Sequence, residues 1–401
     1  MEHEFKTTSF SQTLLWFGAA ISIAEILTGA LIAPLGLFKG TMAILIGHII
    51  GTTVLFLTGY IGAKSKLSAI ESTRISFGKY GSYVFSVLNI LQLLGWTAVM
   101  IINGAIALDG VTQDIFKYQN VTLWCILIGA LICIWIIIGI KNLSKVNIFA
   151  VGALFLFTIV LGVTVFSGTP AGNSILTETL SFGAAVELSV IMPLSWLPLI
   201  SDYTRNVKRE KAGSLFSALG YFVGSSFMYI IGLGAAIYAG TSDISVILIS
   251  AGLGIIAFLI VILSTVTTTF LDAYSAGVSF VNIREKANEK LVAIIVCVIG
   301  VVMAILIPTS QYENFLYLIG SVFAPLFAIL ITDYYIFKIQ TVDESSVLNI
   351  KNAIIWVIGV IAYRMLMPYN SPIGITLPVM FGIGLLCIII NGGINQCLKK
   401  S

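Results

Sequence analysis

Two carboxylic acids interrupt long apolar stretches of this sequence. Glu25 lies in "SIAEILTG" and Asp272 lies in "TTTFLDAYSAG". An acid at the centre of a membrane helix costs about 2.5–3.5 kcal/mol on insertion scales, so it normally faces a polar partner or a cavity. An ionised carboxylate only accepts hydrogen bonds, and the amine or hydroxyl groups of a ligand are suitable donors. The two acids therefore indicate a binding site for a small polar molecule within the membrane.

Polar stripes accompany Asp272 and Trp96. At about 100° per residue, the run 245–282 places the following residues within about 40° of one line: Thr265, Thr268, Asp272, Ala276 and Ser279. The run 80–108 carries a second stripe of Asn89, Gln92, Trp96, Met100 and Asn103. Hydroxyls in membrane helices usually bond back to the preceding turn or join helices. Between Gln92 and Asn103, however, Trp96 is a candidate platform for stacking a flat ring.

A flat heterocycle with amine or hydroxyl donors would match both the tryptophan and the acids. A sodium ion is a further candidate, held between backbone carbonyls of the first apolar run and hydroxyls of the run 245–282, because hard cations prefer oxygen ligands. Alternatively, one of the two acids titrates and couples transport to protons. No other cofactor is expected.

The composition is that of a membrane protein. Of the 401 residues, 58% are hydrophobic and 10% are charged, whereas soluble domains carry about 25% charged residues. Runs of about 18 to 25 apolar residues are long enough to cross a bilayer as helices. We count twelve: 13–37, 41–63, 80–108, 121–140, 145–167, 181–201, 214–239, 245–282, 290–308, 312–338, 350–367 and 375–397. The connections are short, so we expect one transmembrane domain, 1–401.

The distribution of Lys and Arg predicts the orientation, because cytoplasmic loops hold them preferentially. With the N-terminus inside, 18 of the 21 basic residues fall on the cytoplasmic side, and only Lys39, Lys117 and Arg364 fall outside. We therefore expect a multi-pass protein of the cell (plasma or inner) membrane with both termini cytoplasmic. The acidic N-terminal segment lacks a basic n-region, so the first run is expected to be a retained span rather than a cleaved signal.

Two of the runs contain residues that break helices. The run 13–37 contains Thr28, Gly29 and Pro34, and the run 181–201 contains Pro193 and Pro198. Broken backbone at membrane depth is tolerated only where it is buried in protein or lines a cavity. The two runs are the first and the sixth, which predicts an inverted repeat of five plus five helices with a central site. The alternative is that these prolines merely kink ordinary membrane helices.

That repeat divides the domain into three parts. The first repeat would be 13–167, the inverted second repeat 181–338, and two extra helices would occupy 350–397. Outside the site, His48 is expected to be a satisfied core residue, and Glu187 to act at a gate or a helix end.

Other classes of protein are less consistent with the sequence. An intramembrane enzyme would need paired acids or a histidine cluster such as HExxH, and the two histidines, His3 and His48, lack that spacing. A channel would show pore-lining rings from oligomeric symmetry, whereas paired broken helices indicate a gated site. The five cysteines form no CxxC pair, and no basic tract indicates nucleic acid. The expected partners are the bilayer and a small substrate, with no obligate protein partner.

Several segments resemble one transporter family. They are "QLLGW" (92–96), "SWLPLISDYTR" (195–205), "DAYSAG" (272–277) and the opening "AEILTGALIAPLGL". With these, the sequence resembles the nucleobase:cation symporters, or purine–cytosine permeases, most closely their CytX-type hydroxymethylpyrimidine transporter branch, over essentially the whole chain. The resemblance implies an all-α leucine-transporter-like fold, and uptake of a nucleobase-like heterocycle driven by a cation gradient.

The resemblance also implies roles for individual residues. Trp96 matches a tryptophan that stacks on the ligand, and Gln92 matches the glutamine before it. Asp272 lines up with an asparagine that hydrogen-bonds the base. Thr267 and Thr268 match hydroxyls that ligate sodium. Asp202 and Arg205 are expected to act in gating.

Three departures from the family pattern bear on the substrate. Met100 replaces a polar amide, Asp272 replaces the asparagine, and Glu25 stands in the first broken run. The second stacking tryptophan would fall near Pro193, with Trp196 one turn further on. Losing an amide and gaining two acids favours a ligand with an exocyclic amine and a hydroxymethyl group. We expect the thiamine precursor 4-amino-5-hydroxymethyl-2-methylpyrimidine, with a cytosine or purine permease as the alternative.

Overall fold

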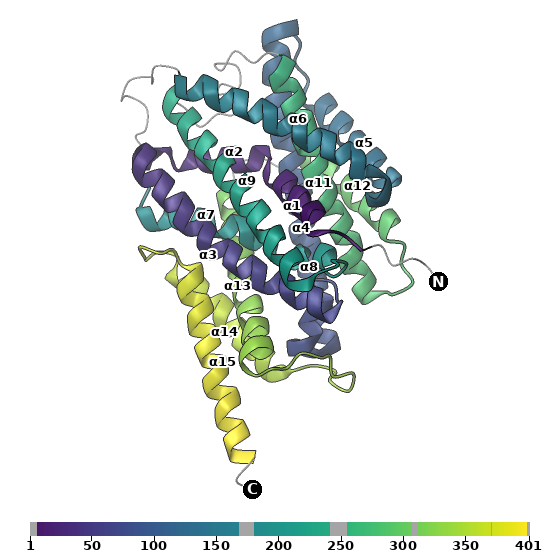
Figure 1. Cartoon of the computed structure of the whole chain (residues 1–401), viewed down its shortest axis with the longest axis vertical. Helices are drawn as coiled ribbons and strands as arrows, with labels where there is room; N and C mark the ends of the chain where they lie inside the picture. The colour runs from purple at the N-terminus through teal and green to yellow at the C-terminus, as the bar shows by residue number, and fades with distance from the viewer. Residues whose placement is uncertain (1–5, 168–179, 241–254, 307–311, 370, 399–401) are drawn as a thin grey trace.

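The computed structural model describes residues 6–167, 180–240, 255–306, 312–369 and 371–398. Over these ranges the chain is almost entirely helical (Figure 1), and an isolated β-bridge joins Thr7 to Val207. The parts of the expected runs at 245–254 and 307–308 lie outside the described residues.

Each of the twelve apolar runs coincides with a helix or with a pair of helices. The elements are α1 (Ser9–Ala20), α2 (Ile23–Leu31), η1 (Ala33–Leu35), α3 (Gly36–Ser65), η2 (Glu71–Thr73), α4 (Arg74–Phe116), α5 (Val121–Ile138), α6 (Ile140–Ser167), α7 (Phe182–Ser195), α8 (Leu197–Thr204), α9 (Glu210–Ala239), α11 (Ile255–Ile283), α12 (Glu289–Leu306), α13 (Tyr312–Ile331), η4 (Thr332–Ile336), α14 (Ile350–Leu366) and α15 (Thr376–Leu398). The fold is therefore all-α, as expected.

Among the described residues, eight helical segments are long and apolar enough to cross a membrane. The bent pair α1 and α2 makes a ninth. Three of the twelve expected spans, those in α6, α14 and α15, are not among these segments. Their apolar helical stretches are shorter than 18 residues where the structure describes them. Large apolar side chains that are exposed on the outer helices, such as Ile137, Leu306 and Phe381, suit contact with lipid.

The first broken run does break, but earlier than expected. α1 and α2 meet at an angle of 56° at Ile21 and Ser22, whereas Thr28 and Gly29 are helical and Pro34 lies in η1. The Thr28 hydroxyl donates to the carbonyl oxygen of Ala24 at 2.7 Å, so it stays within the helix. The Ser22 hydroxyl accepts from the backbone N–H of Glu25 at 3.4 Å, which caps the new helix.

The second broken run breaks where its prolines predict. α7 ends at Ser195 and α8 begins at Leu197, with Trp196 between them. Pro193 lies in the last turn of α7, and Pro198 lies in the first turn of α8. Because proline at the start of a helix gives up an N–H that would have no helical partner anyway, Pro198 suits the beginning of α8.

Helices from distant parts of the sequence surround these breaks. α2 packs on α9, and α4 packs along α11. A side chain at Gly29 would meet the Tyr229 carbonyl oxygen, and one at Gly232 would meet that of Ile26. These two glycines therefore allow the backbones of α2 and α9 to approach closely, as small residues do in membrane bundles. α14 and α15 lie at the side of the bundle, against α13 (Figure 1).

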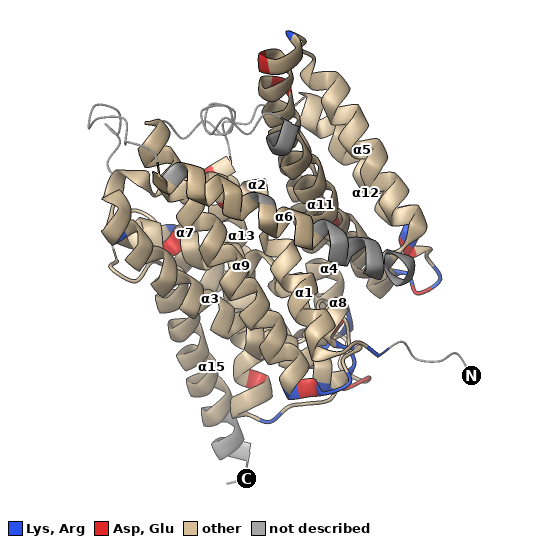
Figure 2. Cartoon of the chain, turned by 45° about the horizontal axis from the view of Figure 1, so that its top comes forward, with Lys and Arg blue, Asp and Glu red and all other residues tan. Residues whose placement is uncertain are grey.

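The charged residues lie mainly at the ends of the helices. Figure 2 shows Lys and Arg gathered chiefly toward the end of the bundle where the described chain begins and ends. Lys399 and Lys400, which contributed to the predicted orientation, lie outside the described residues.

Candidate functional site

A narrow cavity lies at the two helix breaks. Its lining comes from α1–α2, α4, α7–α8 and α11: Ser22, Ala24, Glu25, Trp96, Met100, Met192, Ser195, Trp196, Thr268 and Asp272. Each of these residues is at most 7% exposed, so the cavity is nearly closed to solvent. Five of the proposed ligand-binding residues, Glu25, Trp96, Met100, Trp196 and Asp272, are brought together here.

Asp272 is the least satisfied polar group of the cavity. It lies on α11 and is 4% exposed, and it forms no hydrogen bond or ion pair with any described residue. A buried carboxyl group without partners is costly, and such groups are normally paired. The arrangement leaves both Asp272 oxygens available to a ligand.

Glu25 also lines the cavity, from the first turn of α2. Unlike that of Asp272, its carboxyl group already accepts hydrogen bonds from the protein. Its Oε1 accepts from the Tyr221 hydroxyl and its Oε2 accepts from the Ser225 hydroxyl, both at 2.7 Å. Both donors belong to α9. Sequence patterns did not single out these donors, because each is an ordinary residue of an apolar helix.

His48 extends this set of contacts. Its Nε2 lies 2.5 Å from the Ser225 hydroxyl oxygen, and its Nδ1 lies 2.8 Å from the Ile44 carbonyl oxygen. The residue is fully buried on α3. It is a satisfied core residue, as expected, but it is also only one hydroxyl group away from Glu25.

Trp96 and Met100 line the cavity from successive turns of α4. The Trp96 ring makes edge-on contacts with Tyr312 at 6.1 Å and Phe315 at 5.4 Å. Its Nε1 is buried without a hydrogen-bond partner among the described residues. α13 thus packs against the Trp96 ring and helps to fix its orientation, and the same ring borders the cavity.

Trp196 reaches the same cavity from the break between α7 and α8. Its Nε1 donates to the Tyr221 hydroxyl at 2.9 Å, and its ring makes an edge-on contact with Trp16 at 5.5 Å. Tyr221 in turn donates to Glu25. The two broken helices are therefore linked through one tyrosine of α9.

The amide stripe of α4 supports the second break. Gln92 donates through Nε2 to the Ser195 carbonyl oxygen at 3.1 Å, and Asn89 donates to that of Pro198 at 3.2 Å. Asn89 also donates to the Ser279 hydroxyl at 2.8 Å, which joins the stripes of α4 and α11. The carbonyl groups in the last turn of a helix lack helical partners, and Gln92 satisfies that of Ser195 at the end of α7.

Three residues of the α4 stripe, Asn89, Gln92 and Asn103, do not line the cavity. Gln92 is buried beside it, with an Oε1 that has no partner among the described residues. Asn103 is half-buried one turn beyond Met100 and is absent from the cavity wall. The part of the expected stripe that lines the cavity therefore spans two turns, those of Trp96 and Met100. The amide residues before and after them lie away from the open space.

Of the two proposed cation ligands, Thr268 contacts the first broken run. Thr268 Oγ1 donates to the Ala19 carbonyl oxygen of α1 at 3.3 Å, whereas Thr267 Oγ1 donates to Leu263 within α11 at 2.8 Å. Thr268 thus meets a carbonyl of the broken helix, as a sodium site would require. Among the described residues, no group of three or more His, Cys, Asp or Glu could hold a metal ion.

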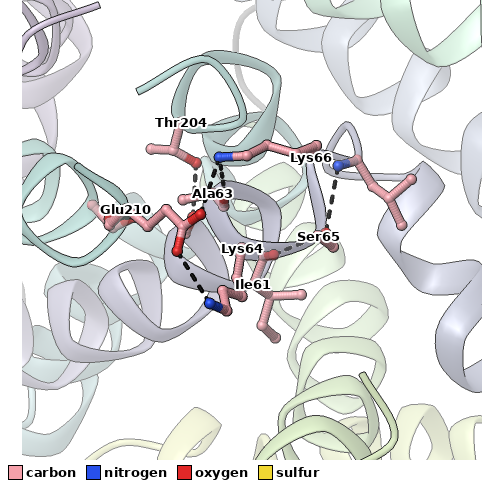
Figure 3. Close-up of polar contacts among 10 residues, drawn as sticks. Ile61, Ala63, Lys64, Ser65, Lys66, Thr204 and Glu210 are labelled. Atoms are coloured by element: carbon pink, nitrogen blue, oxygen red, sulfur yellow. Dashed lines mark hydrogen bonds and ion pairs between the residues drawn. The ribbon is translucent and has the colours of Figure 1, made fainter. Parts of the chain in front are cut away.

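The residues expected to gate lie at the end of α8. Asp202 Oδ1 accepts from the backbone N–H of Ala69 at 2.9 Å, and Arg205 is half-buried at the end of that helix. No ion pair joins these two residues in the described structure. Instead, Lys64 in the last turn of α3 and Lys66 just after that helix pair with Glu210 of α9 at 3.4 and 3.3 Å (Figure 3).

Glu187 has the helix-end role that was one of its two expected roles. Its Oε2 accepts from the backbone N–H groups of Ile375 and Thr376 at 2.6 and 2.9 Å, at the beginning of α15. Its Oε1 accepts from the hydroxyls of Tyr363 and Thr376. A carboxylate is favoured at a helix N-terminus, so Glu187 fastens α14 and α15 to α7.

Comparisons with known proteins give a family and a fold. Residues 2–381 match the family described as permease for cytosine/purines, uracil, thiamine, allantoin. The chain is 28% identical over 327 residues to the cytosine permease of Escherichia coli strain K12, covering 80% of this chain and 76% of the relative. It is 23% identical over 361 residues to the hydantoin permease of Microbacterium maritypicum, covering 82% and 73%.

Solved structures share the architecture at low sequence identity. The inward-facing conformation of Mhp1 matches with a TM-score of 0.80 and 18% identity, covering 98% of this chain and 92% of that one. A Na⁺-coupled sialic acid symporter, in a substrate-bound outward-open state, matches with a TM-score of 0.71 and 15% identity, covering 98% and 90%. These likenesses confirm the expected leucine-transporter-like fold.

Proposed function

The chain belongs to the permease family for cytosine/purines, uracil, thiamine and allantoin, and on that premise we propose that it imports an aminopyrimidine together with a cation. It is a multi-pass membrane transporter of nucleobase-like substrates, not an enzyme. Our proposed substrate is the thiamine precursor hydroxymethylpyrimidine, as in the CytX-type branch.

One observation carries the proposal. Asp272 is a buried acid without a partner among the described residues, and it shares a cavity with Trp96. A ligand with an exocyclic amine donates to such an acid, while its flat ring stacks on the indole. A neutral ligand that presents only acceptors would leave Asp272 unsatisfied, so it is disfavoured.

In the proposed complex the residues around the ligand have distinct roles. Trp96 stacks on the ring, Asp272 accepts from the amine, and Trp196 closes the side at the second break. Met100 fills the apolar edge around the methyl group. Gln92 and Asn103 flank the ligand and contact it only if α4 turns as the cavity opens.

We propose that transport follows alternating access between two repeats, 13–167 and 181–338, with 350–397 as two extra helices. Ligand and cation bind at the paired breaks, and one bundle rocks against the other. Binding favours closure only through a higher affinity for the closed state. Asp202 and Arg205 would act as the gate on the side of α8, where Asp202 holds the start of the segment before α4.

Sodium is the proposed coupling ion at the first break. Thr268 and Thr267 would supply hydroxyl oxygens, and the Ala19 carbonyl that Thr268 now contacts would supply a backbone oxygen. We further propose a cell membrane location with both termini cytoplasmic, because that orientation places most Lys and Arg on the inner side.

Cytosine is the second candidate substrate. The relative named cytosine permease is 28% identical to this chain over most of its length. Cytosine shares the aminopyrimidine ring, so Trp96 and Asp272 serve it equally, and the hydroxymethyl group is the difference between the candidates.

A competition experiment on the purified protein separates them. Labelled hydroxymethylpyrimidine is displaced by unlabelled hydroxymethylpyrimidine or cytosine, each with and without sodium. We expect tighter binding of hydroxymethylpyrimidine, and a further gain with sodium. Preferential binding of cytosine would make this chain a cytosine permease, and the absence of binding by either ligand would overturn the proposal.

A further inference from the structure

A continuous set of hydrogen bonds leads from the cavity into the protein core. It begins at Glu25, which lines the cavity, passes through the Ser225 hydroxyl of α9, and ends at His48 of α3. His48 is 0% exposed, and Glu25 is 1% exposed. Glu25 lines the cavity and His48 does not, so Glu25 is the end of the set that a ligand can reach.

The donors and acceptors of this set can be counted. The Ile44 carbonyl oxygen only accepts, so the His48 Nδ1 that faces it carries a proton. Ser225 has one hydroxyl proton and lies between two groups, the Glu25 Oε2 at 2.7 Å and the His48 Nε2 at 2.5 Å. With an ionised Glu25 and a neutral His48, both neighbours of Ser225 are acceptors, and one of them is left unsatisfied.

One additional proton removes this conflict, and it can occupy either end. If Glu25 is protonated, it donates to Ser225, which donates to His48 Nε2. If His48 is protonated, Nε2 donates to Ser225, which donates to an ionised Glu25. Every group is then paired in both arrangements, as buried polar groups normally are.

We propose that Glu25, Ser225 and His48 form a proton-binding relay, so that a proton accompanies the substrate in addition to the cation at the first break. In the transfer, the Glu25 Oε2–H bond breaks as a new Ser225 Oγ–H bond forms. The original Ser225 Oγ–H bond breaks as a His48 Nε2–H bond forms. Glu25 becomes a carboxylate and His48 an imidazolium, and no other group is consumed.

Substrate binding is linked to the relay through Glu25, and this link rests on the proposed function. An amine or hydroxyl donor in the cavity favours the ionised form of Glu25. The proton then moves to His48, and it returns to Glu25 when the ligand leaves. The proton stays within the relay while the ligand is bound, because without it Ser225 can satisfy only one of its two neighbours, Glu25 and His48.

No basic side chain of the described structure pairs with Glu25 in place of the proton. The titratable groups that face it from other helices are Tyr221 and Tyr229 on α9, Tyr312 on α13, Asp272 on α11 and His48 on α3. The acids of α7 and α8, Glu187 and Asp202, are engaged elsewhere. Tyr229 packs edge-on against the His48 ring at 4.7 Å, which holds its orientation.

Transport by the full-length protein in proteoliposomes tests the relay. Radiolabelled hydroxymethylpyrimidine is followed with equal sodium on both sides of the membrane under an inward proton gradient, and separately as exchange at equal pH. For Ser225→Ala and for His48→Gln, we expect at least a tenfold loss of gradient-driven accumulation while exchange persists. The matched control is Ser226→Ala, which removes a neighbouring buried hydroxyl with no partner in the described structure and retains both activities.

Wild-type accumulation that is the same with and without the proton gradient would overturn the relay. Gradient-driven accumulation that Ser225→Ala retains would overturn it as well. Equal loss in Ser226→Ala would do the same, since any serine of α9 would then matter. If Ser225→Ala does not fold, His48→Gln makes the same test from α3.

A second measurement needs no substrate, so it distinguishes failure of the relay from failure of the proposed function. Infrared difference spectra are recorded as the pH of the ligand-free protein is changed. We expect a carboxyl signal that Glu25→Gln removes and that Asp272→Asn leaves in place. Identical spectra for the wild-type protein and Glu25→Gln would overturn the relay, whatever the substrate proves to be.

Discussion

At the residue scale, two acids on one cavity have opposite surroundings. Glu25 accepts hydrogen bonds from two hydroxyls of α9, whereas Asp272 has no partner among the described residues. The first acid is therefore built into the protein, and the second is left for a ligand. This difference is the basis of our proposals that Glu25 binds a proton and that Asp272 binds the substrate.

Replacement of Asp272 by asparagine should weaken substrate binding without unfolding the protein. A hydrogen bond to a charged group contributes about 1.5–3 kcal/mol, so we expect roughly a ten- to hundredfold loss of affinity in a binding assay. Asp343→Asn, in an exposed connection, is the control and should bind as the wild type does. Unchanged affinity in Asp272→Asn would remove this acid from the site.

Trp96→Ala should also weaken binding, because the stacking surface is lost. Stacking of a base on an aromatic side chain contributes about 1–3 kcal/mol by alanine substitution, which is roughly a five- to hundredfold change in affinity. Trp124→Ala is the matched control, since its ring packs on Phe258 at 5.6 Å and does not line the cavity. An equal effect of both substitutions would point to general packing instead of stacking.

At the element scale, the site depends on the close approach of α2 and α9. Gly29 and Gly232 have no room for a side chain at this crossing. The approach places Tyr221 and Ser225 within hydrogen-bonding distance of Glu25. Two glycines far from each other in sequence thus determine the surroundings of the buried acid.

Gly232→Ala should destabilise the protein and disturb the relay together. Overpacking of a well-packed contact typically costs about 1–3 kcal/mol, so we expect a lower melting temperature and reduced proton-driven uptake. Gly152→Ala is the control, because a side chain there would meet no atom within 4 Å. A melting temperature equal to that of the wild type would show that α2 and α9 can move apart to accommodate the added methyl group without loss of stability.

Two sets of contacts near the end of α8, one buried and one exposed, should contribute differently to the free energy of unfolding. Asp202→Ala leaves the buried N–H of Ala69 without its acceptor, at a cost of about 1–3 kcal/mol. Glu210→Gln breaks ion pairs with Lys64 and Lys66, whose side chains are 53% and 51% exposed, and should cost about 0–1 kcal/mol. Thermal unfolding in detergent compares the two, and the reverse order would contradict this assignment.

At the scale of the whole molecule, α14 and α15 are fastened to the second broken helix by Glu187. This carboxylate accepts two backbone N–H groups and two hydroxyls. α7 also contributes Met192 to the cavity wall. The two extra helices are thus fixed to α7, a broken helix that lines the cavity and takes part in the proposed mechanism.

Glu187→Ala should therefore lower stability more than it lowers substrate affinity. Each orphaned donor costs roughly 1–3 kcal/mol, so we expect the largest fall in melting temperature among these variants. Binding should weaken far less than in Asp272→Asn. Glu313→Ala, at an exposed acid of α13, is the control and should melt as the wild type does. A wild-type melting temperature for Glu187→Ala would show that α15 is held by other contacts.

The sequence by itself determined the all-helical membrane architecture, the breaks in the first and sixth runs, and the stripes of α4 and α11. These features follow from local rules, since apolar length, proline geometry and helical periodicity are properties of a single segment. Five residues proposed for ligand binding do line one cavity. Gln92 and Asn103 do not, because a helical stripe gives the direction of its side chains but not the positions along the helix at which neighbouring helices leave space.

Only the tertiary structure decided what surrounds each acid. Ser225 lies 200 residues from Glu25 and 177 residues from His48 in the sequence, and no pattern in either segment relates them. The first break also lies before the expected Thr28 and Gly29, because Ser22 caps α2 and Thr28 bonds within its own helix. Such outcomes depend on which helices approach closely enough for hydroxyl groups to meet, and that distance is set by packing between segments.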